Sequence, residues 1–148
     1  MKKKPNLGNR FVLAAAAAVV AASLVFSACN DEELTAKLVE IEEQLKPAER
    51  ARKLMNIDQE YPGNVMVKAF LGNALLEAGE VETAKGVLER GRALLTPSDS
   101  NALHRRVYRD LVKIAVLRSN WSTVNRYTAQ LSRFEGEVKQ KTWSLWGY

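Results

Sequence analysis

Cysteine and histidine are nearly absent from this chain, and aromatic residues are few. The 148 residues contain one cysteine, Cys29, and one histidine, His104. A single cysteine excludes an internal disulfide, so packing must hold the folded part together. A lone histidine with no cysteine or carboxylate cluster at ligand spacing argues against a metal site. Aromatic residues make up only 7% of the chain, which does not favour a ring-lined pocket for a small molecule or glycan.

Patterns typical of strands and of catalytic sites are also lacking. There is no alternation of period two, and therefore no strand followed by a glycine-rich phosphate loop. Ser98, Asp99 and His104 have the residue types of a hydrolase triad, but they stand at an expected helix start, where helix capping explains them better. Three glutamates within residues 40–43 are best interpreted as the solvated face of a helix. We therefore expect no enzymatic activity and no cofactor.

The N-terminal segment has the layout of a secretory signal peptide. A cationic start, MKKKPNLGNR, precedes a 16-residue apolar run and the sequence SAC, which ends at Cys29. This segment resembles a bacterial lipoprotein signal, although Phe26 stands where that family prefers leucine. The resemblance implies a signal peptide at residues 1–28 and a lipidated N-terminus with a short linker at 29–32. The alternative is an uncleaved transmembrane anchor, because residues 11–28 could almost span a bilayer.

Removal of the leader also removes most of the positive charge. The net charge falls from +5 to +1, which leaves no reason to expect a nucleic-acid partner. Residues 29–84 carry 12 acidic and 6 basic side chains, whereas residues 85–148 carry 5 acidic and 12 basic ones. This asymmetry indicates either ordinary helix solvation or an electropositive binding end.

After the leader, apolar residues recur at helical spacing, and glycine and proline occur at separated points. Leu34, Leu38, Ile41 and Leu45 form one apolar stripe, and Pro47 is expected to end that helix. Five further helices are predicted, at about residues 48–60, 65–78, 81–95, 101–118 and 121–134. Two prolines 35 residues apart, Pro62 and Pro97, each close a helical hairpin. Such a period suggests stacked helical pairs.

The segment FLGNALLEAGEVETAKGVLERGRALLTP, residues 70–97, resembles a tetratricopeptide repeat. Gly72 and Ala84 occupy its small positions, where two antiparallel helices approach closely. Lys68 stands where the pattern has tryptophan, and Pro97 comes one residue late.

A weaker copy of the repeat follows, with Tyr108 and Leu111 at first-helix positions and Val112 in place of the glycine. That replacement predicts a splayed or shifted hairpin. The resemblance implies an all-α fold, a short solenoid of about three antiparallel helical hairpins over residues 33–134. The aromatic tail, residues 135–148, either caps the last repeat or docks on a partner or on the membrane interface.

The resemblance implies a scaffold that binds another envelope protein. The chain is similar to small repeat-bearing lipoproteins that help to assemble outer-membrane proteins, pili or transport complexes. The resemblance implies that it is held on the inner or outer membrane and faces the periplasm. In tetratricopeptide proteins the first helix of each hairpin lines the groove. Arg106, Arg109 and Lys113 form one stripe of such a helix, and Asn73 is their expected polar neighbour.

We expect these four residues to recognise an acidic segment or a free C-terminal carboxylate. Three alternatives remain open. The stripe could be an ordinary solvated face, or it could pair with the acidic N-terminal half or between copies. The protein could also be a small-molecule or glycan-binding periplasmic lipoprotein.

Overall fold

The computed structural model describes residues 31–145, with side chains up to residue 135. The chain divides into two compact units, one up to Lys37 and one from Leu38 onward. Of the first unit, residues 31–37 are described, and they are helical. The predicted signal peptide and Cys29 lie outside the described residues, as do Trp146, Tyr148 and the side chains of Trp143 and Leu145.

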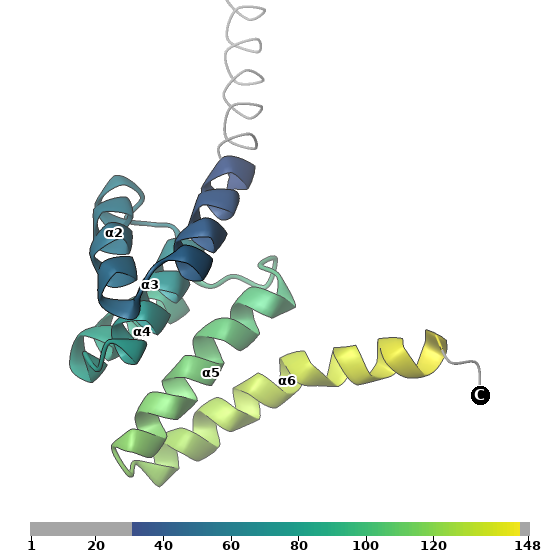
Figure 1. Ribbon diagram of the computed structural model, residues 1–148. Coiled ribbons are helices and arrows are strands. Elements are labelled where there is room, and N and C mark those ends of the chain that lie inside the picture. The colour runs from purple at the N-terminus through teal and green to yellow at the C-terminus, as the bar shows by residue number, and fades with distance from the viewer. Residues whose placement is uncertain (1–30, 146–148) are drawn as a thin grey trace, which may run out of the picture. The chain divides into compact units, whose positions relative to one another are not determined.

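The second unit consists of helices joined by short turns (Figure 1). Residues 38–44 are helical, and five helices follow: α2 (Pro47–Glu60), α3 (Val65–Glu77), α4 (Val81–Leu94), α5 (Asn101–Leu117) and α6 (Trp121–Leu145). The described residues contain no strand, which confirms the predicted all-α class. The bounds of α2 to α5 agree with the sequence analysis to within one residue, whereas α6 continues well past its expected end at Phe134.

Side-chain caps and a special backbone conformation set the starts of α3 and α5 and the end of α3. The Asn64 side chain accepts a hydrogen bond from the backbone N–H of Val67 at the start of α3, 3.1 Å long. Ser100 does the same for Leu103 at the start of α5, 3.2 Å long. After α3 the chain reverses at Gly79, whose φ of +86° is a conformation that glycine adopts at little cost.

The central helix of the unit is α3, which packs on α2, α4 and α5. Eight of its 13 residues are buried, among them Leu75, which is fully enclosed. Gly72 faces α4 so closely that an added Cβ would lie 2.3 Å from Cγ of Leu88. Ala84 is also fully buried. The short residue at position 72 therefore sets the distance between the two helices, as the repeat pattern predicts for a small residue.

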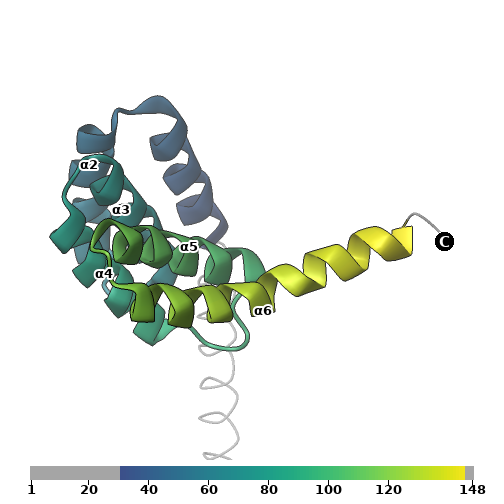
Figure 2. The same cartoon turned by 90° about the horizontal axis from the view of Figure 1, so that it is seen from below.

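Helices α5 and α6 form an antiparallel hairpin at the C-terminal end of the unit. Both views show α5 and the first part of α6 side by side (Figures 1 and 2). Stacked rings join them: the ring centroids of His104 and Phe134 lie 4.3 Å apart. Because α6 has 25 residues and α5 has 17, α6 extends beyond its partner. Gly136 does not end the helix, because glycine costs only about 1 kcal/mol in a helix interior.

None of the described helices is both long enough and apolar enough to cross a membrane.

Candidate binding surfaces

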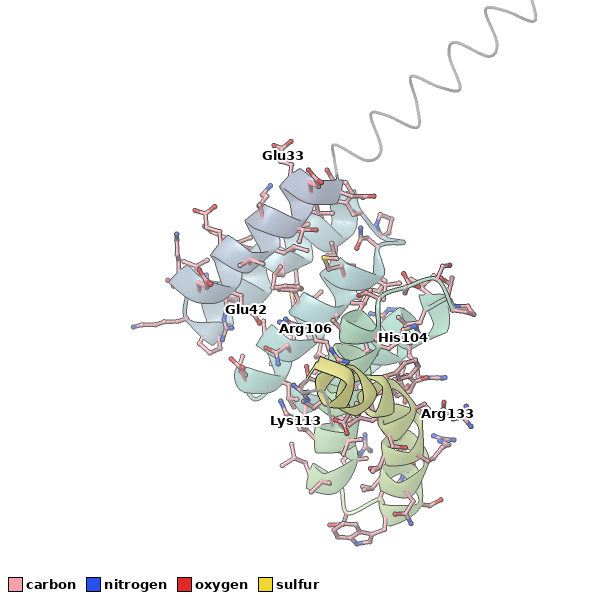
Figure 3. The ribbon with its side chains drawn as sticks, turned by 90° about the vertical axis from the view of Figure 1, so that its right-hand side faces the viewer. Glu33, Glu42, His104, Arg106, Lys113 and Arg133 are labelled. Atoms are coloured by element: carbon pink, nitrogen blue, oxygen red, sulfur yellow. The ribbon has the colours of Figure 1, made fainter. Side chains whose placement is uncertain are left out.

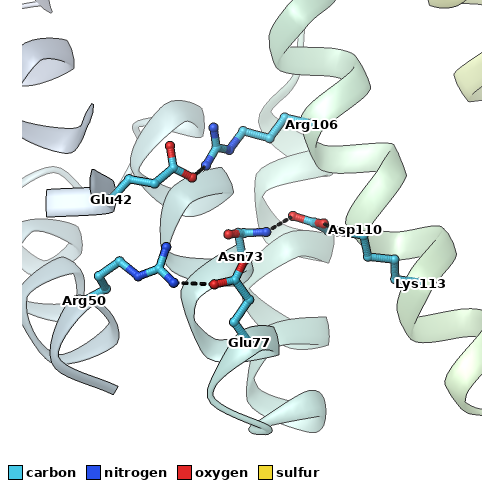
Figure 4. Close-up of polar contacts among 7 residues, drawn as sticks. All are labelled: Glu42, Arg50, Asn73, Glu77, Arg106, Asp110 and Lys113. Carbon is cyan, nitrogen blue, oxygen red and sulfur yellow. Dashed lines mark hydrogen bonds and ion pairs between the residues drawn. The ribbon is translucent and has the colours of Figure 1, made fainter. Parts of the chain in front are cut away.

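The four predicted recognition residues, Asn73, Arg106, Arg109 and Lys113, are called the recognition face below. Asn73 lies on α3 and the other three on α5, so the face extends over two helices. Both helices meet at Asp110, which is 2% exposed. Its carboxylate accepts hydrogen bonds from Nδ2 of Asn73 at 3.0 Å and from Nζ of Lys113 at 2.8 Å (Figure 4).

Arg106 also has an acidic partner within the chain. Its guanidinium group pairs with Glu42 from helical residues 38–44 (Figure 4), and its Cζ lies 3.8 Å from the ring centroid of Phe70. Both side chains of the ion pair remain about one-third exposed, at 30% and 32%. Arg109 is exposed and makes no ion pair with the described residues. The structure thus joins Asn73 and Lys113 through Asp110, pairs Arg106 separately with Glu42, and leaves Arg109 open to solvent.

Two further ion pairs, neither predicted from the sequence, connect α2 to α3. Arg50, 8% exposed, pairs with Glu77 (Figure 4). Lys68, 5% exposed, donates to Asp58 at 2.8 Å. The sequence feature that could have indicated the second ion pair was Lys68 itself, because it is a charged residue at a position where the repeat pattern has tryptophan. Gly91 of α4 leaves room for it, since a Cβ there would lie 3.2 Å from Cβ of Lys68.

A pocket of about 220 Å³ lies where α4, α5 and α6 meet, and we call it the junction pocket. Residues from all three helices and from the α5–α6 turn line it: Lys85, Glu89, Leu111, Ile114, Ala115, Arg118, Asn120, Thr123, Arg126 and Tyr127. None of these belongs to the recognition face. No sequence motif identified this pocket, because it arises from the packing of three helices.

Three apolar side chains stand exposed at the α5–α6 turn, next in the chain to pocket residues. Val116 is 44% exposed, Leu117 65% and Trp121 62%. Arg118 and Asn120, which line the junction pocket, lie between them in the sequence. These exposed side chains make the α5–α6 turn a candidate contact surface.

The loop between α4 and α5 contains the residues considered as a hydrolase triad, and Thr96 is their common contact. The Asp99 carboxylate accepts hydrogen bonds from the Thr96 backbone N–H at 2.6 Å and hydroxyl at 2.8 Å. Nε2 of His104 lies 3.0 Å from the Thr96 carbonyl oxygen, and the Ser98 and Thr96 hydroxyls are 3.1 Å apart. The hydrogen bonds from Thr96 lower the pKa of Asp99 below its ordinary value, and nearby His104 adds a smaller effect. These contacts stabilise the loop between α4 and α5 and the first turn of α5, which is the structural role that helix capping predicts for these residues.

Among the residues that the structure describes, no three histidine, cysteine, aspartate or glutamate side chains gather closely enough to hold a metal ion. No protein-family model matches the chain, and neither a curated protein nor a solved structure matches it.

Proposed function

We propose that this chain is a protein-interaction scaffold, anchored to a bacterial envelope membrane through lipid on Cys29. In this proposal residues 33–134 form a short tetratricopeptide-like solenoid. The packing order of the helices supports it. Helix α3 packs on α2 and α4, α5 packs on α4 and α6, and α3 also contacts α5. Contact between the first helices of successive hairpins is a feature of stacked helical repeats.

The observation that carries the proposal is the hydrogen bond between Asn73 of α3 and Asp110 of α5, 3.0 Å long. It joins the first helices of two successive hairpins beneath the exposed side chains of Arg109 and Lys113, so a partner lying there would be placed at the junction of the two hairpins. A surface that extends over several repeats is how solenoid proteins bind their partners.

The internal ion pairs define which part of the recognition face is available to a partner. Arg106 and Lys113 already hold carboxylates of the chain, so an acidic partner must compete with Glu42 and Asp110 for them. Arg109 is exposed and offers its guanidinium group without that competition. An acidic segment or a free carboxylate is therefore proposed to bind first at Arg109. The proposal requires no catalytic step, cofactor or nucleic acid.

Lipid anchoring is tested by mass spectrometry of the mature N-terminus. The expected product begins at acylated Cys29, and Cys29→Ala should leave an unlipidated precursor. Several acyl chains, each contributing about 0.8 kcal/mol per buried CH₂, would hold the domain on a membrane almost permanently. An intact leader with an unmodified Cys29 would contradict the proposal.

The recognition face is tested by crosslinking in intact cells from a photoreactive residue at position 113, which leaves Arg109 in place. The captured protein should be lost when Arg109 is changed to glutamine. Arg133→Gln is the matched control, because Arg133 is exposed on α6, away from Lys113 (Figure 3). Equal capture in all variants would show that recognition lies elsewhere on the molecule.

A further inference from the structure

The junction pocket has an apolar floor, which comes from α5. Leu111, Ile114 and Ala115 line it, and each is at most 4% exposed. In the described part of the chain, α4 and α6 both pack on α5 but not on each other. The surface of α5 between them is therefore left as the bottom of a pocket. Asn73 of α3 contacts a different face of α5, so the pocket and the recognition face are separate surfaces.

The rim of the junction pocket is cationic. Lys85, Arg118 and Arg126 line it, with Glu89 as the only carboxylate among the lining residues. Glu89 lies 3.7 Å from Lys85, and Arg118 is paired with Glu82 outside the pocket at 2.8 Å. These two ion pairs leave Arg126 as the rim cation without an acidic partner in the described residues.

Arg126 is held near the pocket by its neighbour. Its Cζ lies 5.0 Å from the ring centroid of Tyr127, and Tyr127 itself is 5% exposed and lines the pocket. A guanidinium group over an aromatic ring is attracted by the ring while its N–H groups stay available. The arrangement thus offers hydrogen-bond donors for a carboxylate beside an apolar cavity.

The size of the pocket limits its occupant. Its volume of about 220 Å³ is smaller than the roughly 300–1,000 Å³ of pockets that enclose small-molecule ligands. It is larger than the roughly 150 Å³ that accommodates benzene. One amino-acid side chain therefore fits. The exposed Leu117 and Trp121 lie beside the pocket in the chain and offer apolar contacts for the residues that flank an inserted side chain.

We propose that the junction pocket binds an acidic peptide segment of a protein partner, with one apolar side chain inserted between α4 and α6. A carboxylate next to that side chain binds Arg126, and the rest of the segment lies over Leu117 and Trp121. This is a second binding surface, so the inference goes beyond the proposed function and holds whether or not the recognition face binds anything.

The experiment uses the full chain in mild detergent and a fluorescein-labelled pentapeptide with one leucine flanked by two glutamates on each side. Fluorescence anisotropy measures its affinity. Arg126→Gln should weaken binding about threefold to fivefold, as expected for a partly exposed ion pair. Thr123→Leu should abolish binding, because the longer side chain of this lining residue fills the pocket. Arg133→Gln, a charge removal elsewhere on α6, should leave the affinity unchanged.

Circular dichroism must show that both pocket variants melt like the wild type, since Arg126 is exposed and Thr123 only half-buried. A control peptide with glutamine in place of every glutamate should bind at least threefold more weakly. Equal binding of the two peptides, or wild-type affinity in Thr123→Leu, would overturn the proposal. Failure of the pentapeptide to bind the wild-type chain would also overturn it. Weaker sedimentation of a Leu117→Ala, Trp121→Ala double variant than of the wild type with anionic vesicles would then show that the surface contacts lipid.

Discussion

The hairpins α3–α4 and α5–α6 are built on similar sequence patterns, yet they differ in how much of their surface is buried. In α3, eight of 13 residues are buried, because this helix has neighbours on several sides. In residues 121–135 of α6, Tyr127 alone is buried. Helix α3 thus mainly stabilises the fold, and α5 buries six residues as well, whereas α6 and the α5–α6 turn keep apolar and cationic groups available.

One position accounts for the close contact within the central hairpin. Gly72 allows α4 to approach α3 until Leu88 fills the space where a side chain would be. The corresponding residue of the next hairpin is Val112, which is half-buried. Val112 does not line the junction pocket, and the contact between α5 and α6 is comparable in extent to that between α3 and α4. The pocket arises instead because, among the described residues, α4 and α6 both pack on α5 without packing on each other.

The largest expected effect comes from removing a central leucine. Leu75→Ala on α3, where the side chain is fully buried, should cost about 2–5 kcal/mol of unfolding free energy, because it leaves a cavity. Leu117→Ala, at a position that is 65% exposed, should change stability by less than about 0.5 kcal/mol. Urea unfolding of both variants measures the contrast. Equal losses would mean that the two hairpins are packed alike.

Overpacking of the close contact should have the next largest effect. Gly72→Leu places atoms where Leu88 already lies and should cost on the order of 1–3 kcal/mol. Gly86→Ala on α4 is the matched control, since the nearest atom to its added Cβ is the flexible end of Arg90 at 3.6 Å. That control should be neutral or slightly stabilising. If Gly72→Leu melts at the wild-type temperature, α3 and α4 are not packed as described.

Loss of the buried carboxylate in the recognition face should have a smaller effect. Asp110→Ala leaves the Asn73 amide without its acceptor and should cost about 1–2 kcal/mol. Arg109→Gln, a charge removal at an exposed neighbour, should leave the melting temperature unchanged. Thermal unfolding of both variants would show whether the network is structural, and an unaffected Asp110→Ala would contradict that role.

The sequence predicted most of the fold because local signals set most of the helix bounds. Ser100 and Asn64 are strong caps, and Gly79 ends α3, so α3 and α5 begin and end where expected. The end of α6 could not be predicted in the same way. Neither proline nor a cap signal follows Phe134, and Gly136 alone is too weak to stop a helix.

The candidate sites were less predictable, because they depend on residues far apart in the chain. Glu42 and Arg106 are 64 positions apart, so their pairing remained one alternative among several. Lys68 was recognised as a departure from the repeat pattern, yet its burial against Asp58 requires the packed helices. The junction pocket is lined by residues of three helices, so it forms only when all three are packed together. Such features follow from tertiary packing, which sequence periodicity does not specify.

The smallest predicted effect concerns pH and the loop between α4 and α5. Because the folded chain lowers the pKa of Asp99, its carboxylate stabilises the fold above the ordinary pKa of about 3.9. That contribution is lost as the pH falls through the lowered value. The Thr96 amide proton should therefore shift in nuclear magnetic resonance spectra with a midpoint below the ordinary pKa of an aspartate. A midpoint at or above the ordinary value would contradict the hydrogen bonds described.

Hydrogen exchange of the full chain tests the central comparison most directly. Amides in the middle of α3 should exchange only through global unfolding, because neighbouring helices enclose them. Amides of residues 121–135 in α6 should exchange much faster, through local opening of a helix that buries only Tyr127. Slower exchange in α3 than in α6, by about tenfold or more, is the predicted result. Equal protection of the two helices would contradict the division between a stabilising α3 and a more open α6.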